Sequence, residues 1–174
     1  MKKILAFAGS NSKTSINKQL AIYAASLINE EYDVADLNNY ELPIFSLEIE
    51  AKGFPKSALE FNELLRRYDG FVISLAEHNG SYSAVFKNLF DWVSRIDRKV
   101  FKDKPVLLMA TSPGGRGGAS VLETAANTFP HLGASSVITF SLPSFFDNFK
   151  GDKIQNSEMN ESLLKAVEEF KSII

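Results

Sequence analysis

The sequence predicts an α/β protein built on a parallel sheet of five strands. Two continuous apolar runs, residues 71–76 and 104–110, are typical of strands buried on both faces of a sheet. Each predicted strand is followed by a segment with helical spacing of apolar residues, so strand and helix alternate five times. This alternation indicates a parallel sheet with right-handed crossovers and helices on both faces.

The first strand and helix surround a hydroxyl-rich turn. The strand is predicted at residues 1–8, because residues 4–8 are apolar, and the turn covers residues 9–14. A helix at residues 15–28 carries apolar side chains at helical spacing: Ile16, Leu20, Ala24, Leu27 and Ile28. The second strand is predicted at residues 32–37, directly after this helix.

A long irregular connection follows at residues 38–55. Connections of this length are usually functional or mobile, and apolar residues in this one indicate that it covers something or meets a partner. The next helix is predicted to begin at Ser57, because Ser57 and Glu60 have the spacing of a capping box. Its inward residues are expected to be Ala58, Phe61, Leu64, Leu65 and Tyr68.

The central strands come next. We predict the third strand at residues 71–76, a loop at 77–83, a helix, and the fourth strand at 104–110. The helix carries one apolar stripe: Tyr82, Phe86, Leu89, Val93 and Ile96. Phe90 and Trp92 widen this stripe beyond what one sheet face needs, so we expect part of the helix to face another subunit.

The remaining elements complete the fold. We predict a loop at residues 111–118, a helix at 119–131, the fifth strand at 135–140 and a loop at 141–155. Asn156 or Ser157 is expected to cap the last helix. No repeat or linker divides the chain, so residues 1–174 are predicted to form a single domain. Five parallel strands fit the flavodoxin-like order 2-1-3-4-5, a three-layer α/β sandwich.

Composition excludes several classes of function. The chain has no cysteine, and its two histidines, His78 and His131, are far apart, so we expect no metal. A formal net charge of −2 provides no basic face for nucleic acid. No signal peptide is visible, and no apolar run approaches the roughly 20 residues that span a bilayer. We therefore expect a cytoplasmic protein without a membrane or nucleic-acid partner.

The turn after the first strand has the chemistry of a phosphate site. A helix N-terminus presents unpaired N–H groups and a partial positive charge to an anion. Gly9 allows a tight turn, and hydroxyls come from Ser10, Ser12, Thr14 and Ser15. The alternative is that Ser15 only caps the helix within an ordinary polar loop. A Walker A loop and a dinucleotide fingerprint are disfavoured, because each needs further glycines.

Three polar loops are expected to meet at one edge of the sheet. Ligands of open α/β sheets bind beyond the carboxyl ends of the strands, here between the first and third strands. The loops there, residues 9–14, 77–81 and 111–118, suit a flat, hydrogen-bonding ring, although the last could be a flexible surface turn. Arg116 either faces solvent or reaches a second phosphate-bearing ligand. His78 either stacks on the ring or faces solvent.

At these residues the chain resembles the NADPH-dependent FMN reductases, which include bacterial quinone and chromate reductases and azoreductases. The family pattern Gly-Ser-x-Arg-x-x-Ser-x-Asn compares with residues 9–17, where Ser12 replaces the Arg. The family loop Pro-Glu-Tyr-Asn-Gly-Ser compares with residues 76–81, where Ala76 and His78 replace Pro and Tyr. Residues 87–95 and 112–118 also look like the family, so the resemblance covers nearly the whole chain.

The resemblance implies an NAD(P)H-dependent oxidoreductase that passes hydride from NADPH or NADH through bound FMN to a quinone-like or other small acceptor. The implied phosphate ligands are Ser10, Ser12, Ser15, Ile16 and Asn17. The flavin ring would lie between two segments: Glu77, His78, Asn79, Gly80 and Ser81 on one side, and Ser112, Pro113, Gly114 and Gly115 on the other. No catalytic acid or base is implied. A homodimer or homotetramer is expected.

Two alternatives belong to other classes. The first is a flavodoxin-type electron carrier or flavin-binding module without enzymatic turnover. Such carriers tend to be strongly acidic around the flavin, whereas the formal net charge here is only −2. The second is a binder of another phosphorylated ligand that has lost flavin, which the replacements at Ser12 and His78 motivate.

Overall fold

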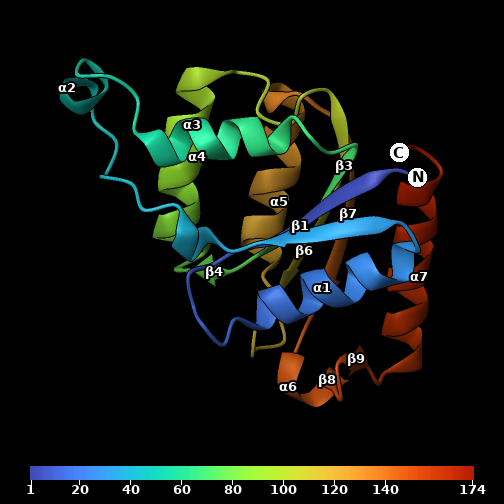
Figure 1. Ribbon diagram of the computed structural model, residues 1–174. Helices are drawn as coiled ribbons and strands as arrows, with labels where there is room; N and C mark the ends of the chain where they lie inside the picture. Colours follow the sequence, from blue (N-terminus) through green and yellow to red (C-terminus); the bar gives the residue numbers. More distant parts are fainter.

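A computed structural model describes all residues, 1–174, and shows a five-stranded sheet between two layers of helices (Figure 1). The strand order is β2-β1-β3-β6-β7, and every pairing in this sheet is parallel. Counted along the chain, these strands have the order 2-1-3-4-5. The predicted flavodoxin-like α/β fold is therefore confirmed.

The elements fall into three groups. The sheet contains β1 (Lys3–Gly9), β2 (Glu31–Ala35), β3 (Gly70–Leu75), β6 (Lys104–Thr111) and β7 (Ala134–Leu142). The long helices are α1 (Ile16–Ile28), α3 (Lys56–Leu65), α4 (Ala84–Ile96), α5 (Ala119–Thr128) and α7 (Ser157–Lys171). The short elements are η1 (Leu37–Asn39), α2 (Leu47–Glu50), β4 (Glu77–His78), β5 (Ser81–Tyr82), η2 (Phe129–Leu132), α6 (Phe145–Asn148), β8 (Phe149–Lys150) and β9 (Lys153–Ile154).

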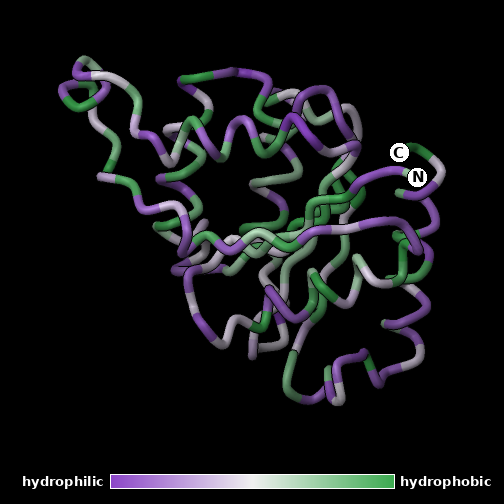
Figure 2. Tube along the Cα trace, viewed as in Figure 1, coloured by the Kyte–Doolittle hydropathy of each residue, from purple (hydrophilic) through white to green (hydrophobic).

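Alternate residues of the central strands supply two separate cores. On β3, Phe71 and Ile73 join the core beneath α3, α4 and α5, whereas Val72 joins the core beneath α1 and α7. Every residue of β3 is buried, which confirms the interpretation of its continuous apolar run. Figure 2 shows the same result as a band of hydrophobic residues through the middle of the molecule. Both faces of the sheet are thus covered, as parallel sheets require.

Of the two helix caps predicted from local sequence patterns, at α7 and at α3, one is confirmed and one is wrong. Asn156 caps α7, since its Oδ1 accepts a hydrogen bond from the Met159 N–H at 3.0 Å. The predicted capping box at Ser57 is wrong. Helix α3 begins one residue earlier, at Lys56, with Pro55 in the cap position and no side-chain cap. Ser57 therefore lies inside the first turn, where its hydroxyl cannot cap that turn.

The long connection before α3 packs on α4. The Trp92 Nε1–H donates to the Pro43 carbonyl at 2.8 Å, and the Phe45 ring meets the Trp92 ring edge-to-face at 5.0 Å. The chain itself thus buries Trp92 completely and Phe90 almost completely. The expectation that these two side chains extend α4 towards another subunit is wrong. Past Phe45, the segment around α2 projects from the body (Figure 1).

No helix combines the length and the apolar character that crossing a bilayer requires. No group of three or more His, Asp or Glu side chains comes together as a metal site.

Gly9 provides a test of the packing where β1 ends. A Cβ atom there would lie 2.7 Å from Leu75 Cδ2 and 3.3 Å from the Phe86 ring, and both side chains are buried. The Gly9→Ala variant should therefore lose about 1–3 kcal/mol of unfolding free energy through overpacking. Gly114→Ala is the matched control, because a Cβ there meets nothing within 4 Å. Equal urea midpoints for the two variants would contradict this account.

Candidate ligand-binding site

The predicted loops meet around a cavity of about 260 Å³ at the carboxyl edge of β1, β3 and β6. Its walls come from the turn before α1, the segment after β3, the segment after β6 and one residue of α6. The lining residues are Ser10, Ser12, Thr14, Ser15, Ile16, Asn17, Ala76, Glu77, His78, Thr111, Ser112, Pro113 and Phe146. The convergence of three loops, inferred from strand order alone, is therefore observed.

The first turn of α1 directs donors at this cavity. Ser15 caps the helix, because its Oγ accepts from the Lys18 N–H at 3.1 Å, and its own hydroxyl proton stays free to donate. The N–H groups of Ile16 and Asn17 have no acceptor within the protein. We call these three groups the donor cluster. Ser15 as an ordinary helix cap and Ser15 as an anion ligand are thus compatible.

The Asn17 side chain holds the donor cluster in place. It is 3% exposed, and its Nδ2 donates to the Thr111 carbonyl at 3.2 Å. Its Oδ1 accepts from the Ser74 Oγ at 2.7 Å and from the Thr111 N–H at 3.1 Å. The amide thereby joins α1 to β3 and β6. The main-chain N–H of Asn17 is left for a ligand.

The charged side chains Lys13, Lys18 and Asp36, in and around the start of α1, are not part of the cavity lining. The Lys18 ammonium lies 2.7 Å from Asp36 Oδ2, and this contact, with the Asn38 N–H, lowers the pKa of the Asp36 carboxyl to about 2. Lys13 is exposed, and the first turn of α1 contains no acidic residue. Apart from Glu77, whose carboxylate accepts from the Val121 N–H, an anion in the cavity would meet neutral N–H and hydroxyl groups, together with the positive end of the helix dipole.

Glu77 joins two of the loops. Its Oε2 accepts from the Val121 N–H at 3.0 Å, in the first turn of α5. The cap residue of that helix is Gly118, which has no side chain to perform this role. The Glu77 carboxylate therefore supplies the cap from the neighbouring loop. Next to it, β4 and β5 form a hairpin that turns through Asn79 and Gly80, whose φ angles are 53° and 76°.

The segment after β6 is held at its far end by close packing. Gly117 and Gly118 have φ angles of 57° and 74°, and a Cβ on Gly118 would lie 2.8 Å from Ala110 Cβ. Arg116 is exposed, and its Nη2 donates to the Ser120 Oγ at 2.7 Å. By contrast, Gly114 and Gly115 face open space.

The predicted site residues divide into two groups. Those that line the cavity are Ser10, Ser12, Ser15, Ile16, Asn17, Glu77, His78, Ser112 and Pro113. Those that lie at exposed positions of the flanking loops, outside the cavity lining, are Asn79, Gly80, Ser81, Gly114 and Gly115. Phe146 also lines the cavity but was not predicted, because it follows β7 and thus comes from outside the three loops. The only signal for it was a Phe–Phe pair within a polar loop.

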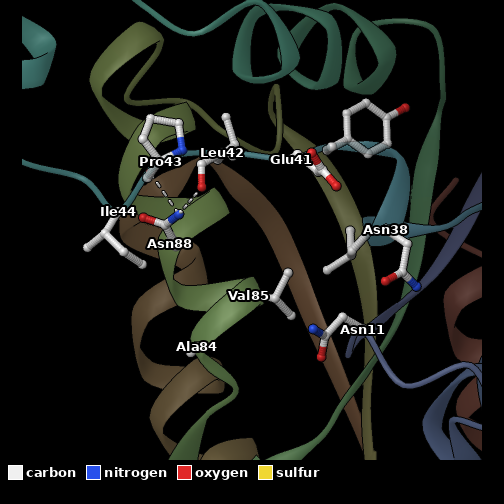
Figure 3. A pocket seen from close by; sticks show the side chains of 11 residues that line it. Asn11, Asn38, Glu41, Leu42, Pro43, Ile44, Ala84, Val85 and Asn88 are labelled. Atoms are coloured by element: carbon white, nitrogen blue, oxygen red, sulfur yellow. Dashed lines mark hydrogen bonds between the residues drawn. The ribbon is translucent and has the colours of Figure 1, made fainter.

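A larger cavity, of about 650 Å³, lies on the other side of the turn before α1 (Figure 3). Residues 37, 38 and 40–44 form one wall, and the first half of α4 forms another. Figure 3 shows the Asn88 amide turned towards the Leu42 and Pro43 carbonyls, which it bonds at 3.4 and 3.0 Å. The Glu41 carboxylate also lines this cavity, and no Lys or Arg does. Each cavity is lined by one glutamate and by no Lys or Arg, so charge does not distinguish the two. The smaller cavity offers an anion the Ser and Thr hydroxyls that line it, and the larger cavity has no Ser or Thr in its lining.

The fold and the smaller cavity define a flavodoxin-like protein with a cavity lined by N–H and hydroxyl donors at the switch point of its sheet. Sequence comparison gives the family. The chain belongs to the NADPH-dependent FMN reductase family, whose profile matches residues 2–147.

Curated relatives match part of the chain. An NAD(P)H-dependent FMN reductase of Pseudomonas aeruginosa is 30% identical over 119 residues, which cover 67% of this chain and 63% of the relative. A 2-hydroxy-1,4-benzoquinone reductase of a Burkholderia species is 35% identical over 118 residues, 67% of this chain and 64% of the relative. The match thus spans less than two thirds of either relative.

Solved structures resemble the whole chain. The flavoenzyme NAD(P)H:(acceptor) oxidoreductase FerB of Paracoccus denitrificans superposes with a TM-score of 0.78 at 24% identity, covering 99% of this chain and 97% of that one. An azoreductase of Bacillus anthracis gives a TM-score of 0.59 at 16% identity, covering 99% of this chain and 98% of that one. At these identities the structures show the shared fold.

Removing the Glu77 carboxylate tests the link between the loops. Glu77→Ala should lose about 1–3 kcal/mol of unfolding free energy, because the buried Val121 N–H is left without an acceptor. Glu77→Gln keeps an acceptor and should lose only the charge interaction with the helix end, about 0.3–1 kcal/mol. Urea denaturation of both variants measures the difference. An equal loss in the two would show that the hydrogen bond contributes nothing.

Proposed function

We propose that the protein is an NAD(P)H-dependent FMN oxidoreductase that passes hydride from NADPH or NADH, through bound flavin, to a quinone-like or other small acceptor. The observation that carries this proposal is the donor cluster. It faces a cavity between the loops at residues 77–81 and 112–115, in a chain of the FMN reductase family. Residues 1–174 would act as one FMN-binding domain.

The phosphate end of FMN fits the donor set. Neutral N–H groups of Ile16 and Asn17 and hydroxyls of Ser10, Ser12 and Ser15 would share the dianion, aided by the helix dipole. The family Arg at position 12 would have formed a bidentate contact, whereas Ser12 supplies one hydroxyl. Main-chain N–H groups and hydroxyls would therefore contribute most of the phosphate binding in this chain.

The ring would lie over the exposed loop segments. A cavity of about 260 Å³ falls below the range of about 300–1,000 Å³ for pockets that enclose a whole ligand. We place the phosphate and the adjoining chain inside it and the isoalloxazine across its rim. The proposed ring contacts are Glu77, His78, Asn79, Gly80 and Ser81 on one side and Ser112, Pro113, Gly114 and Gly115 on the other. Through main-chain groups, Glu77 can serve the ring while its carboxylate caps α5.

When bound, the flavin supplies the redox chemistry, accepting hydride from the nicotinamide and delivering it to the acceptor. The protein's part is to bind the phosphate, orient the ring and leave one ring face open to both substrates in turn. No side chain is assigned as a catalytic acid or base. We also propose a homodimer or homotetramer, which the exposed Leu47 on the projecting segment and the exposed Ile44 just before that segment support.

Stopped-flow absorbance under anaerobic conditions tests the activity. NADH or NADPH is mixed with the FMN-loaded protein, and the flavin absorbance should bleach within seconds with at least one donor. Adding a benzoquinone should then restore it. A protein that binds FMN but is not bleached by either donor would instead be an electron carrier. A protein that binds no FMN would favour another phosphorylated ligand.

Ser15→Ala tests the phosphate anchor. Loss of the hydroxyl should weaken FMN binding about tenfold, which corresponds to about 1.4 kcal/mol, as for a hydrogen bond to a charged group. The variant also loses a helix cap, worth about 1 kcal/mol of stability. Asn156→Ala is the matched control, because it removes the cap of α7, outside the cavity lining. Unchanged FMN affinity in Ser15→Ala, by fluorescence titration, would remove Ser15 from the site.

A further inference from the structure

The chain after β7 turns back onto the cavity and is fixed there. Ser144 has a φ angle of 48°, in the left-handed region that residues other than glycine seldom adopt. In this conformation the Ser144 N–H donates to the Gly114 carbonyl at 3.0 Å, and the Phe145 N–H donates to the Ser112 carbonyl at 3.0 Å. The start of α6 is therefore attached to the same loop that is proposed to hold the flavin ring.

Buried aromatic side chains hold α6 against the body of the protein. Phe145 is 3% exposed and stacks on Phe149 with ring centroids 4.8 Å apart. Phe149 in turn meets the ring of Tyr23 on α1 edge-to-face at 5.7 Å. The Asn148 Nδ2 donates to the Pro143 carbonyl at 2.9 Å. These contacts fix the backbone on both sides of Phe146.

Phe146 itself is exposed although its neighbour is buried. Its ring lies perpendicular to that of Phe145, with centroids 5.6 Å apart, and the residue is 62% exposed. A single exposed apolar residue is ordinary. This one is unusual because it lines the cavity that holds the donor cluster, on a backbone that three hydrogen bonds and stacking contacts keep in position.

We propose that Phe146 is a flavin-contacting residue, an aromatic wall that packs on the isoalloxazine where it leaves the cavity and slows release of the cofactor. This inference rests on the proposed function. An aromatic ring prefers another flat ring in an offset or edge-to-face arrangement, and a rigid wall makes that contact without first being ordered. Phe146 would then contribute apolar contact at a site whose other proposed groups are mainly hydroxyls, amides and glycines.

The test compares FMN with riboflavin, which lacks the phosphate. Titration of Phe146→Ala should show about tenfold weaker binding of both ligands, or about 1.4 kcal/mol, and faster FMN release. Ser15→Ala should weaken FMN but leave riboflavin nearly unchanged. Phe146→Tyr should keep the affinity, and its phenol, in contact with the ring, should shorten the fluorescence lifetime of the bound flavin. Leu164→Ala, which truncates an exposed apolar side chain on α7, is the control and should change neither ligand.

The possible outcomes separate the two proposals. Unchanged FMN and riboflavin affinities in Phe146→Ala would overturn the aromatic wall while leaving the proposed function intact. A loss for FMN alone would also overturn it, because Phe146 would then act through the phosphate loop. Wild-type protein that binds neither ligand would end the proposed function itself. Because Phe146 is exposed, the Ala variant should keep the wild-type melting temperature, so a folding defect cannot imitate the result.

Discussion

The buried amide of Asn17 is the interaction on which the site depends. A buried polar group is tolerated only when it is hydrogen-bonded, and this amide bonds Ser74 on β3 and both main-chain groups of Thr111 on β6. These bonds fix the start of α1 over the ends of the two central strands. The donor cluster is therefore positioned by the sheet itself, and it does not rely on a mobile loop.

Other polar side chains around the cavity are likewise bonded to protein groups. The Asn17 amide and the Glu77 carboxylate are both committed to protein groups, and the Ser83 Oγ, which caps α4, donates to the Gly9 carbonyl at 2.7 Å. Polar side chains thus join the loops to one another, while free main-chain N–H groups and hydroxyls are left for a ligand. The motif residues Asn17 and Glu77 therefore line the cavity while their side chains bond protein groups.

Most of the fold follows from local patterns, and most of the errors are non-local. Continuous apolar runs identify β3 and β6, and strand order then brings the three loops together. No pattern near Trp92 reveals that its indole N–H bonds Pro43, 49 residues away. Phe146 was equally hidden, because its place depends on two hydrogen bonds to a loop from another strand. At Ser57 the local signal itself misled, since the helix starts earlier at Lys56, after Pro55.

The cavity and its rim differ in how they are built. The deep end has fixed donors, held by bonds within the sheet, and suits a small anion of defined shape. The rim consists of glycines in open space, a short hairpin and one fixed aromatic ring. A flat ligand anchored by the donors at the deep end would be held along one edge by the rim, and one of its faces would stay open to solvent. Such an arrangement allows two different substrates to reach the same face in succession, which a fully enclosing pocket would prevent.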